Sequence, residues 1–311
     1  MREKGVFSLM KKIFILLLSA VLALSILAAV SAEDAYTVKV SAPNGAPALA
    51  VATLAAEDPD SYTFVAADTI AAEFANKTAD FIIAPINAGA KLFKAGKSDY
   101  KLAAVVTWGN LYIASQKADF KLEDINGAAI TLFGENTINA SVVLYALAEN
   151  GLEPAAVEYL AGAANTQSLL LTDENSIVVT AEPALTAAKM KNENITAYAV
   201  NDLLKAANGF DGYTQAGLFI SADIIANHPE AAADFLGKAE EAANEDVSAI
   251  AEAAVALEIL PNAKVANTAI PNCAIRFVSA AEAKEQVEAT AKIDLSQFGG
   301  ALPADDFYYG E

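Results

Sequence analysis

Short apolar runs alternate with alanine-rich stretches of helical length along most of the chain. The apolar runs are β-branched or aromatic, and each ends in Gly, Pro or Asn before the next alanine-rich stretch begins. This pattern predicts strands followed by helices. The predicted strands are Thr37–Ala42, Tyr62–Ala67, Asp80–Ala84, Leu102–Thr107, Ala129–Phe133, Val157–Leu160, Ile177–Thr180 and Ile195–Val200. Strands separated by helices predict an α/β fold with mostly parallel sheets flanked by helices on both faces.

Two apolar segments, 105–116 and 212–223, break this alternation because no helix separates their halves. They predict strands that cross between two lobes. Residues 117–211 would then form an inserted lobe II, and 33–116 with 212–311 would form lobe I. Two lobes joined by two strands make a hinge over a cleft. The alternative is that both segments are ordinary strands of one sheet.

Four predicted strand-to-helix junctions carry small and polar residues. They are 42–46, 84–89, 133–137 and 180–183, and the first two have nearly the same sequence, APNGA and APINAG. In an open α/β sheet such junctions gather at the carboxyl ends of the strands, where N–H groups at helix starts point into a crevice. The alternative is that Asn, Gly and Thr only cap helices. The repetition favours a shared ligand site.

Candidate ligand-binding residues come from these junctions and from the crossing segments. Trp108 is the single tryptophan, and its place at a strand end leaves two hypotheses, a core residue or an aromatic platform for a ligand. Glu135 and Glu182 stand at helix starts, where the helix dipole stabilises acidic side chains, and this favours a structural role over acid–base catalysis. The candidates are Asn44, Gly45, Asn87, Trp108, Gly109, Asn110, Gly134, Glu135, Asn136, Thr137, Glu182, Tyr213 and Gln215.

The first 32 residues have the pattern of a secretory signal peptide. Basic residues precede an apolar run at 13–29, and Val30-Ser31-Ala32 provides the small residues of a cleavage site. We expect cleavage after Ala32 and a periplasmic or secreted protein. The alternative is an uncleaved membrane anchor. The segment has no cysteine that could accept a lipid.

Charge and rare residues exclude several functions. The net charge is −19, and removal of the signal peptide would leave 16 basic and 38 acidic residues, hence −22. This disfavours nucleic acid and anionic membranes as partners. Cys273 is the single cysteine, which predicts a small buried hydrophobe without a disulfide. His228 is the single histidine, beside a proline that predicts a turn between helices. No catalytic residue, metal site or cofactor is predicted.

The chain resembles the periplasmic solute-binding proteins of ABC importers with the type II fold, in the branch of sulfonate, nitrate and pyrimidine-precursor binders. The resemblance rests on "APNGAPALA", "DFIIAPINAGAKL", "VVTWGNLYIAS" and "FGGALPADDFYYGE", and its order of elements spans roughly residues 36–309. It implies capture of a small molecule between two lobes and delivery to an importer permease, without catalysis. We also expect a monomer.

An enzyme is the alternative, because a thiamine-pyrimidine synthase resembles the same fold. Its activity, as the resemblance implies, depends on histidine chemistry and iron, which a single His228 does not favour. A surface adhesion protein would have repeats or aromatic patches that this chain lacks.

The nature of the ligand follows from the scarcity of arginine. Arg2 and Arg276 are the two arginines, and no junction carries Arg or Lys. The alternative is an anionic ligand, because helix N-termini can hold an anion with backbone N–H groups alone. The acidic Glu135 and Glu182 would, however, repel an anion. We therefore expect a neutral or cationic, heteroaromatic ligand. Trp108 and Tyr213 would supply apolar faces, and hydrogen bonds would come from Asn44, Asn87, Asn136 and Gln215.

Overall fold

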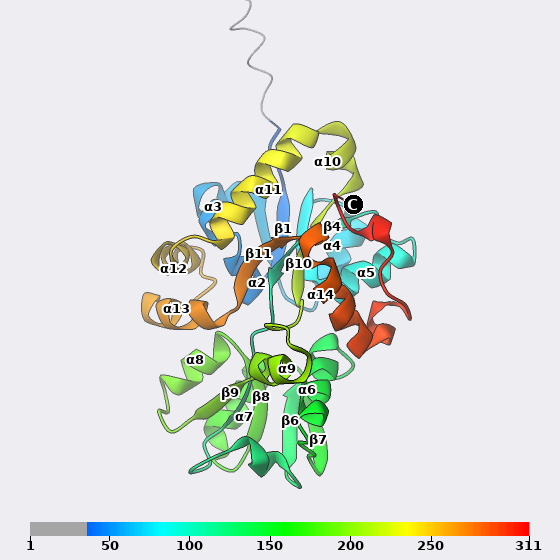
Figure 1. The fold of residues 1–311 in the computed structure, drawn as a ribbon. Coiled ribbons are helices and arrows are strands. Elements are labelled where there is room, and N and C mark those ends of the chain that lie inside the picture. The colour runs from blue at the N-terminus through cyan, green and yellow to red at the C-terminus, as the bar shows by residue number, and fades with distance from the viewer. Residues whose placement is uncertain (1–35, 311) are drawn as a thin grey trace, which may run out of the picture. The chain divides into compact units, whose positions relative to one another are not determined.

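Two β-sheets, each flanked by helices, organise residues 36–310, the part of the chain that the computed structural model describes (Figure 1). The predicted signal peptide and its cleavage site lie outside these residues. Between residues 36 and 310, no helix combines the length and the apolar character needed to span a bilayer.

The first sheet has six strands within residues 36–310, in the order β11-β4-β10-β3-β1-β2. Their bounds are β1 (Val40–Pro43), β2 (Tyr62–Val65), β3 (Phe81–Pro85), β4 (Lys101–Thr107), β10 (Ala216–Ile220) and β11 (Ile275–Ser279). Strand β1 pairs in parallel with β2 and β3, whereas β10 runs antiparallel to both β3 and β4. Strand β11 is antiparallel to β4.

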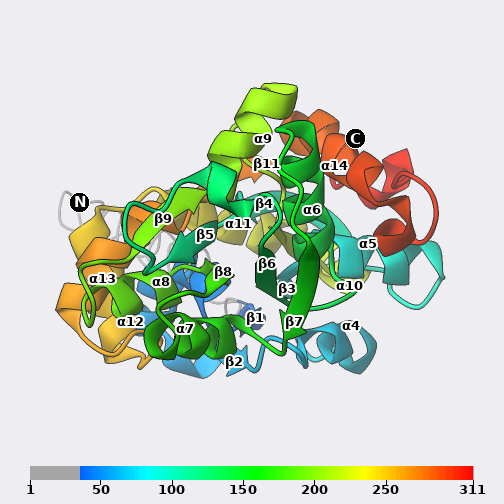
Figure 2. The same cartoon turned by 90° about the horizontal axis from the view of Figure 1, so that it is seen from below.

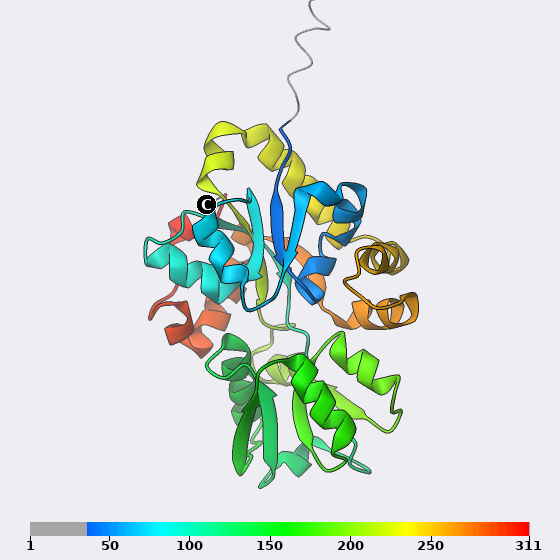
Figure 3. The ribbon, with the colours of Figure 1, turned by 180° about the vertical axis from the view of Figure 1, so that it is seen from behind.

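Helices cover both faces of the first sheet. They are α2 (Ala46–Leu49), α3 (Ala52–Glu57), α4 (Glu73–Asn76), α5 (Ile86–Lys94), α10 (Ala222–Asn227), α11 (Pro229–Ala243), α12 (Val247–Ala256), α13 (Ala263–Ala269) and α14 (Ala280–Ile293). Figures 1 and 3 show α12 and α13 on one side of the sheet and α5 and α14 on the other. Short 3-10 turns are η1 (Pro59–Ser61), η2 (Ile70–Ala72), η3 (Leu122–Ile125), η4 (Ile270–Asn272), η5 (Leu295–Phe298) and η6 (Asp305–Phe307).

Strand β3 is apolar without alternation because both of its faces are buried. Phe81 and Ile83 belong to the core on one face, where the Phe81 ring lies 4.3 Å from that of Phe235 in α11. Ile82 belongs to the core on the opposite face, together with Phe219. Successive side chains of a strand point to opposite faces, so a central strand covered on both sides needs a continuous apolar sequence.

The second sheet has five strands within the described residues, in the order β7-β6-β8-β5-β9. Their bounds are β5 (Leu111–Ser115), β6 (Ala129–Phe133), β7 (Ala156–Leu160), β8 (Ile177–Ala181) and β9 (Thr196–Ala199). The helices are α6 (Ile138–Glu149), α7 (Ala163–Thr172), α8 (Ala184–Lys189) and α9 (Val200–Asn208). Figure 2 shows α6 and α9 on one face of this sheet and α7 and α8 on the other.

The α/β prediction is confirmed, and each predicted strand is present within a few residues of its expected bounds. The sheets are mixed rather than mostly parallel in their pairing, because β10 and β5 are inserted antiparallel between neighbours. Strand β11 was missed by the prediction. His228 lies between α10 and α11, as expected, and Cys273 is buried.

The first apolar segment contains two strands in different sheets, since β4 pairs with β10 and β5 pairs with β8 and β9. The one-sheet alternative is therefore wrong. The chain leaves the first sheet at 108–110, earlier than the predicted boundary after residue 116. An apolar run does not distinguish one strand from two that are separated by a turn. The chain returns to the first sheet between Asn208, where α9 ends, and Ala216.

The two passages between the sheets contact each other in a layer that we call the hinge layer, formed by Trp108, Gly109, Asn201, Gly212 and Tyr213. The Asn201 side chain donates to the carbonyl oxygens of Trp108 (3.0 Å) and Gly109 (2.8 Å). Gly212 has a φ of 95°, and a Cβ atom there would lie 2.2 Å from the Trp108 carbonyl oxygen. Glycine therefore permits both the backbone conformation and the close approach.

Candidate functional site

A cleft of about 940 Å³ opens between the two lobes that the sheets form. Its walls are strand-to-helix junctions of both lobes: β1–α2 and β3–α5 from the first, and β6–α6, β7–α7 and β8–α8 from the second. Such junctions bring helix N-termini and short polar side chains to one place, as the carboxyl ends of strands do in open α/β sheets. All four predicted junctions contribute to this lining.

The structure brings most of the predicted site residues together. Those that line the cleft are Asn44, Gly45, Asn87, Asn110, Gly134, Thr137, Glu182 and Gln215. The cleft lining does not include Trp108, Gly109, Glu135, Asn136 or Tyr213.

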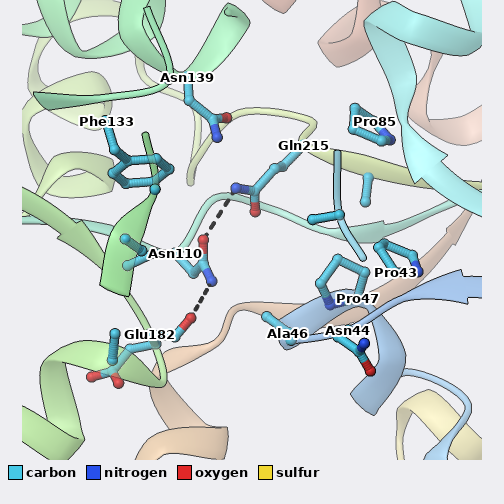
Figure 4. A pocket seen from close by; sticks show the side chains of 18 of the residues that line it. Pro43, Asn44, Ala46, Pro47, Pro85, Asn110, Phe133, Asn139, Glu182 and Gln215 are labelled. Atoms are coloured by element: carbon cyan, nitrogen blue, oxygen red, sulfur yellow. Dashed lines mark hydrogen bonds between the residues drawn. The ribbon is translucent and has the colours of Figure 1, made fainter. Parts of the chain in front are cut away.

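A chain of hydrogen bonds runs across the cleft floor from one lobe to the other (Figure 4). The Nε2 group of Gln215 donates to Oδ1 of Asn110 at 3.1 Å. The Nδ2 group of Asn110 donates to the carbonyl oxygen of Glu182 at 2.8 Å, and the Glu182 backbone N–H donates to the Asn110 carbonyl at 3.0 Å. Asn110 is 5% exposed, so these bonds hold its side chain in one orientation.

Tyr213 supports the cleft floor from behind. Its side chain is 2% exposed, and its hydroxyl donates to Oδ1 of Asn139 at 2.7 Å. Burial raises the pKa of Tyr213, although a hydrogen bond from the Gln215 side chain opposes this shift. The hydroxyl therefore keeps its proton at neutral pH. Tyr213 does not face the cleft, so the expectation that it offers an apolar face to a ligand is corrected.

Trp108 is a core residue rather than a ligand platform. It is 2% exposed, and its indole Nε1 donates to the carbonyl oxygen of Arg276 at 2.9 Å. The Arg276 guanidinium lies 4.3 Å from the centre of the indole ring. One face and the polar edge of the indole are thus used by Arg276, and the rest of the ring is buried within the protein. The position at a strand end, which suggested a platform, corresponds here to the buried contact between the two passages.

Glu135 and Asn136 turn away from the cleft. Both are exposed, and Asn136 has a φ of 59° in the turn between β6 and α6. The Asn136 carbonyl oxygen accepts a hydrogen bond from Nε2 of Gln297 at 3.0 Å. Residues in this turn can therefore touch the opposite lobe, but their side chains are not part of the lining.

Helix capping does not explain Asn44 and Asn87. The N-caps of α2 and α5 are Gly45 and Pro85, and neither helix has a side-chain cap. The Oδ1 atom of Asn87 is buried without a hydrogen-bond partner within the described residues. Capping does explain Thr137, whose hydroxyl accepts from the Ala140 N–H and donates to the Gly134 carbonyl at 2.6 Å.

Glu182 is held by the start of α8. Its carboxylate accepts from the backbone N–H of Thr186 at 3.1 Å and from the Thr186 hydroxyl at 2.9 Å. Burial raises the pKa of Glu182, while the two hydrogen bonds from Thr186 lower it by a smaller amount. The side chain is 4% exposed and points away from Asn110 and Gln215 (Figure 4). These contacts support the predicted structural role at a helix start, whereas the raised pKa disfavours the charged form of the side chain.

Several lining residues were not anticipated. The β7–α7 junction has the same strand, glycine and alanine pattern at 160–163 as the predicted junctions, so this signal was present and was overlooked. Asn139 lies in the first turn of α6 without a distinguishing local pattern. An apolar wall comes from a segment far along the chain: Ile259, Leu260, Pro261 and Val265. Phe133 adds an aromatic ring from the end of β6.

The cleft lining contains few ionisable side chains. Asp68 and Glu182 are the acidic lining residues, and the lining drawn from residues 36–310 contains no Lys, Arg or His. In the same part of the chain, no three His, Cys, Asp or Glu side chains cluster so that they could hold a metal ion. The arrangement suits a ligand that is bound by side-chain amides, helix N-termini and apolar contacts.

The sheet topology and the cleft define the two-lobed periplasmic-binding-protein fold of type II. The sequence matches no protein-family model and no curated protein. Solved structures are similar over nearly the whole described part. An ABC transporter structure from Parabacteroides distasonis is 22% identical, with a TM-score of 0.76, covering 88% of this chain and 99% of that chain.

Two further solved structures illustrate the same likeness. The periplasmic aliphatic sulphonate binding protein SsuA of Escherichia coli is 13% identical, with a TM-score of 0.63, covering 88% of this chain and 91% of that chain. The ligand-binding component of an ABC-type import system from Staphylococcus aureus, with zinc bound, is 12% identical, with a TM-score of 0.65 and coverages of 87% and 95%. At these identities the likeness establishes the fold.

Proposed function

We propose that this protein is an extracytoplasmic solute-binding protein, which captures a small molecule between its lobes and delivers it to the permease of an ABC importer. The observation that carries the proposal is the cleft between the lobes, whose floor is built from both passages of the chain. A ligand bound there would contact both lobes and so favour their closure, since it can shift an equilibrium only through differential contacts. The ABC-importer proteins of the same fold support this proposal.

The cleft chemistry favours binding over catalysis. The carboxylate of Glu182 is occupied by Thr186, and His228 lies between α10 and α11 rather than in the lining. Within the described lining, no nucleophile stands within hydrogen-bond reach of a base, which an activated nucleophile requires. We therefore assign no enzymatic activity to the cleft.

The proposed ligand is a neutral or cationic small molecule with an apolar, heteroaromatic part. Phe133 and the wall at 259–261 replace Trp108 and Tyr213 as the source of apolar contacts. The eight predicted residues that line the cleft are retained as ligand-binding residues. A sulfonate or nitrate would meet helix N-termini but no cationic side chain in this lining.

The proposed cellular setting is the periplasm, reached after removal of residues 1–32, with the protein acting as a monomer. We propose lobes of 36–108 with 213–310 and of 110–211, the passages forming the hinge. Amino-terminal sequencing of exported protein should start at Glu33. A retained Met1 would contradict the cleaved form.

The test is to purify the exported protein under native conditions, unfold it and identify the released small molecules by mass spectrometry. We expect one compound at near-stoichiometric amount, and its return to the refolded protein should raise the melting temperature. Thermal-shift screening of pyrimidines, amines, taurine, alkanesulfonates and nitrate tests the ligand class. Turnover of the recovered compound by the protein would favour the enzyme alternative instead.

A further inference from the structure

Two amide groups at the centre of the cleft are held by the protein and still have one free face each. Within residues 36–310, Nδ2 of Asn139 and Oε1 of Gln215 have no hydrogen-bond partner, and both residues line the cleft. Figure 4 shows these two side chains facing the same open space. An amide whose orientation is fixed presents either a donor or an acceptor to a ligand, so the orientation decides what is recognised.

The orientation of the Gln215 amide follows from the Glu182 carbonyl oxygen, an atom that can accept a hydrogen bond but not donate one. The carbonyl oxygen of Glu182 has no hydrogen, so the Asn110 atom 2.8 Å away must be the Nδ2 group. The other Asn110 atom is then the oxygen, and the Gln215 atom bonded to it must be Nε2. Oε1 of Gln215 is left as the atom that can accept from a ligand.

The orientation of Asn139 is set by Tyr213. The Tyr213 hydroxyl donates to Oδ1 of Asn139 at 2.7 Å, so Nδ2 of Asn139 remains as a donor. Tyr213 is buried and belongs to the hinge layer, so it positions Asn139 without touching the ligand.

From this geometry we infer that the cleft recognises a ligand that carries a hydrogen-bond acceptor and a hydrogen-bond donor side by side, as in an uncharged carboxamide, lactam or cyclic ureide. The inference rests on the proposed solute-binding function and deepens it. The ligand oxygen would accept from Asn139 Nδ2, and the ligand N–H would donate to Gln215 Oε1. A fully ionised oxyanion carries hydrogen-bond acceptors but no donor. It would leave Gln215 Oε1 without a partner and place an oxygen lone pair of the ligand against it. A site with a fixed hydrogen-bonding group rejects ligands that leave this group unpaired.

The first test uses chemically matched probes with the full exported protein. The probes are nicotinamide with methyl nicotinate, and uracil with 1,3-dimethyluracil, together with benzenesulfonate and taurine. Calorimetry should show the N–H-bearing member of a pair binding at least tenfold more tightly than its partner, and the molecule released from native protein should carry an amide-type N–H. Tighter binding of the sulfonates or of the N–H-free members would overturn the inference while leaving solute binding intact. Absence of both a released molecule and any probe binding would overturn both proposals.

The second test separates positioning from folding. Tyr213→Phe frees Asn139 to rotate, so the ligand oxygen, which both members of each matched pair carry, loses its fixed donor. Both members should then bind at least threefold more weakly, while the preference for the N–H-bearing member is kept through Gln215 Oε1. Tyr198→Phe is the control, because its hydroxyl donates to the Phe120 carbonyl at 3.0 Å away from the cleft, and it should keep the full affinity. If Tyr213→Phe does not fold, Asn139→Asp serves instead: it still accepts from Tyr213 but loses the donor, and the affinity should again fall. An unchanged affinity in a folded variant contradicts the assignment.

Discussion

The hinge layer and the cleft floor are built from the same two passages of the chain, but their polar groups are used differently. Trp108 and Asn110 are two residues apart, as are Tyr213 and Gln215. In the hinge layer, the indole N–H of Trp108 donates to the Arg276 carbonyl oxygen, and the Trp108 carbonyl oxygen accepts from the Asn201 side chain. In the cleft floor, Gln215 keeps one amide atom free for a ligand.

This difference shows that residues only two positions apart in the sequence can have different roles, one in the stability of the hinge layer and the other in ligand binding. Gly109 has a φ of 84°, which interrupts the extended backbone between Trp108 and Asn110. The regular alternation of side chains therefore does not apply there, and neighbouring residues enter different surroundings. Substitutions in the hinge layer should change stability, whereas substitutions in the lining should change affinity.

The largest expected effect is on stability, from Gly212→Ala. The added Cβ would lie 2.2 Å from the Trp108 carbonyl oxygen at a left-handed backbone position, so the free energy of unfolding should fall by about 3 kcal/mol. Chemical denaturation measures this. Gly237→Ala is the control, because a Cβ there meets nothing within 4 Å in helix α11, and it should stabilise by up to about 1 kcal/mol. Equal effects of both changes would argue against a tightly packed hinge layer.

Trp108→Phe should lower the free energy of unfolding by about 2 kcal/mol, because it removes the hydrogen bond to Arg276 and part of the buried ring. Ligand affinity, measured by calorimetry with the molecule recovered from the native protein, should change by less than about threefold. The platform hypothesis, one of the two that the sequence leaves open for Trp108, would instead give a loss of affinity. A large loss of affinity with unchanged stability would restore the platform hypothesis.

Asn87→Ala should weaken ligand binding by about tenfold, or about 1.4 kcal/mol, with little loss of stability. The reason is that its buried Oδ1 has no partner within the described residues and the helix it begins is not capped by it. Asn262→Ala provides the contrast, because Asn262 caps α13 through the Val265 N–H and its loss should cost about 1 kcal/mol of stability with affinity retained. Asn87 would be a structural residue if its replacement lowered the melting temperature as Asn262→Ala does.

The smallest expected effect is the pH dependence caused by Glu182. Burial raises the pKa of this acid above its ordinary value of 4.5, so the folded protein disfavours the charged form. Its contribution to stability is therefore fully present below about pH 4.5 and is lost as the pH rises through the higher pKa of the folded state. Glu182→Gln should have an unfolding free energy that increases relative to the unsubstituted protein as the pH rises.

Melting temperatures between about pH 4 and about pH 8 measure this difference. Thr186→Ser is the control, because it keeps the N–H and the hydroxyl that bind the carboxylate and should leave the pH dependence unchanged. A difference between Glu182→Gln and the unsubstituted protein that does not vary with pH would show that folding does not raise the pKa of Glu182.

Local patterns in the sequence determined the elements and where strands pass into helices. The continuous apolar run of β3 and the polar seam after it, 85–89, predicted a buried strand and a cleft-facing junction, because both properties depend on neighbours in the chain. The scarcity of basic residues likewise predicted a cleft without cationic side chains, as the described lining has.

Only the tertiary structure decided which side of each passage faces the cleft. Trp108 and Tyr213 are residue types that often contact ligands. Their polar groups are instead hydrogen-bonded to Arg276, Asn139 and Asn201, which lie far away in the sequence. The donor on Asn139 depends on the Tyr213 hydroxyl, and the acceptor on Gln215 depends on a chain of bonds that ends at the Glu182 carbonyl. Hydrogen bonds of this kind join residues that no local pattern connects, so the orientation of the amides is a property of the folded chain.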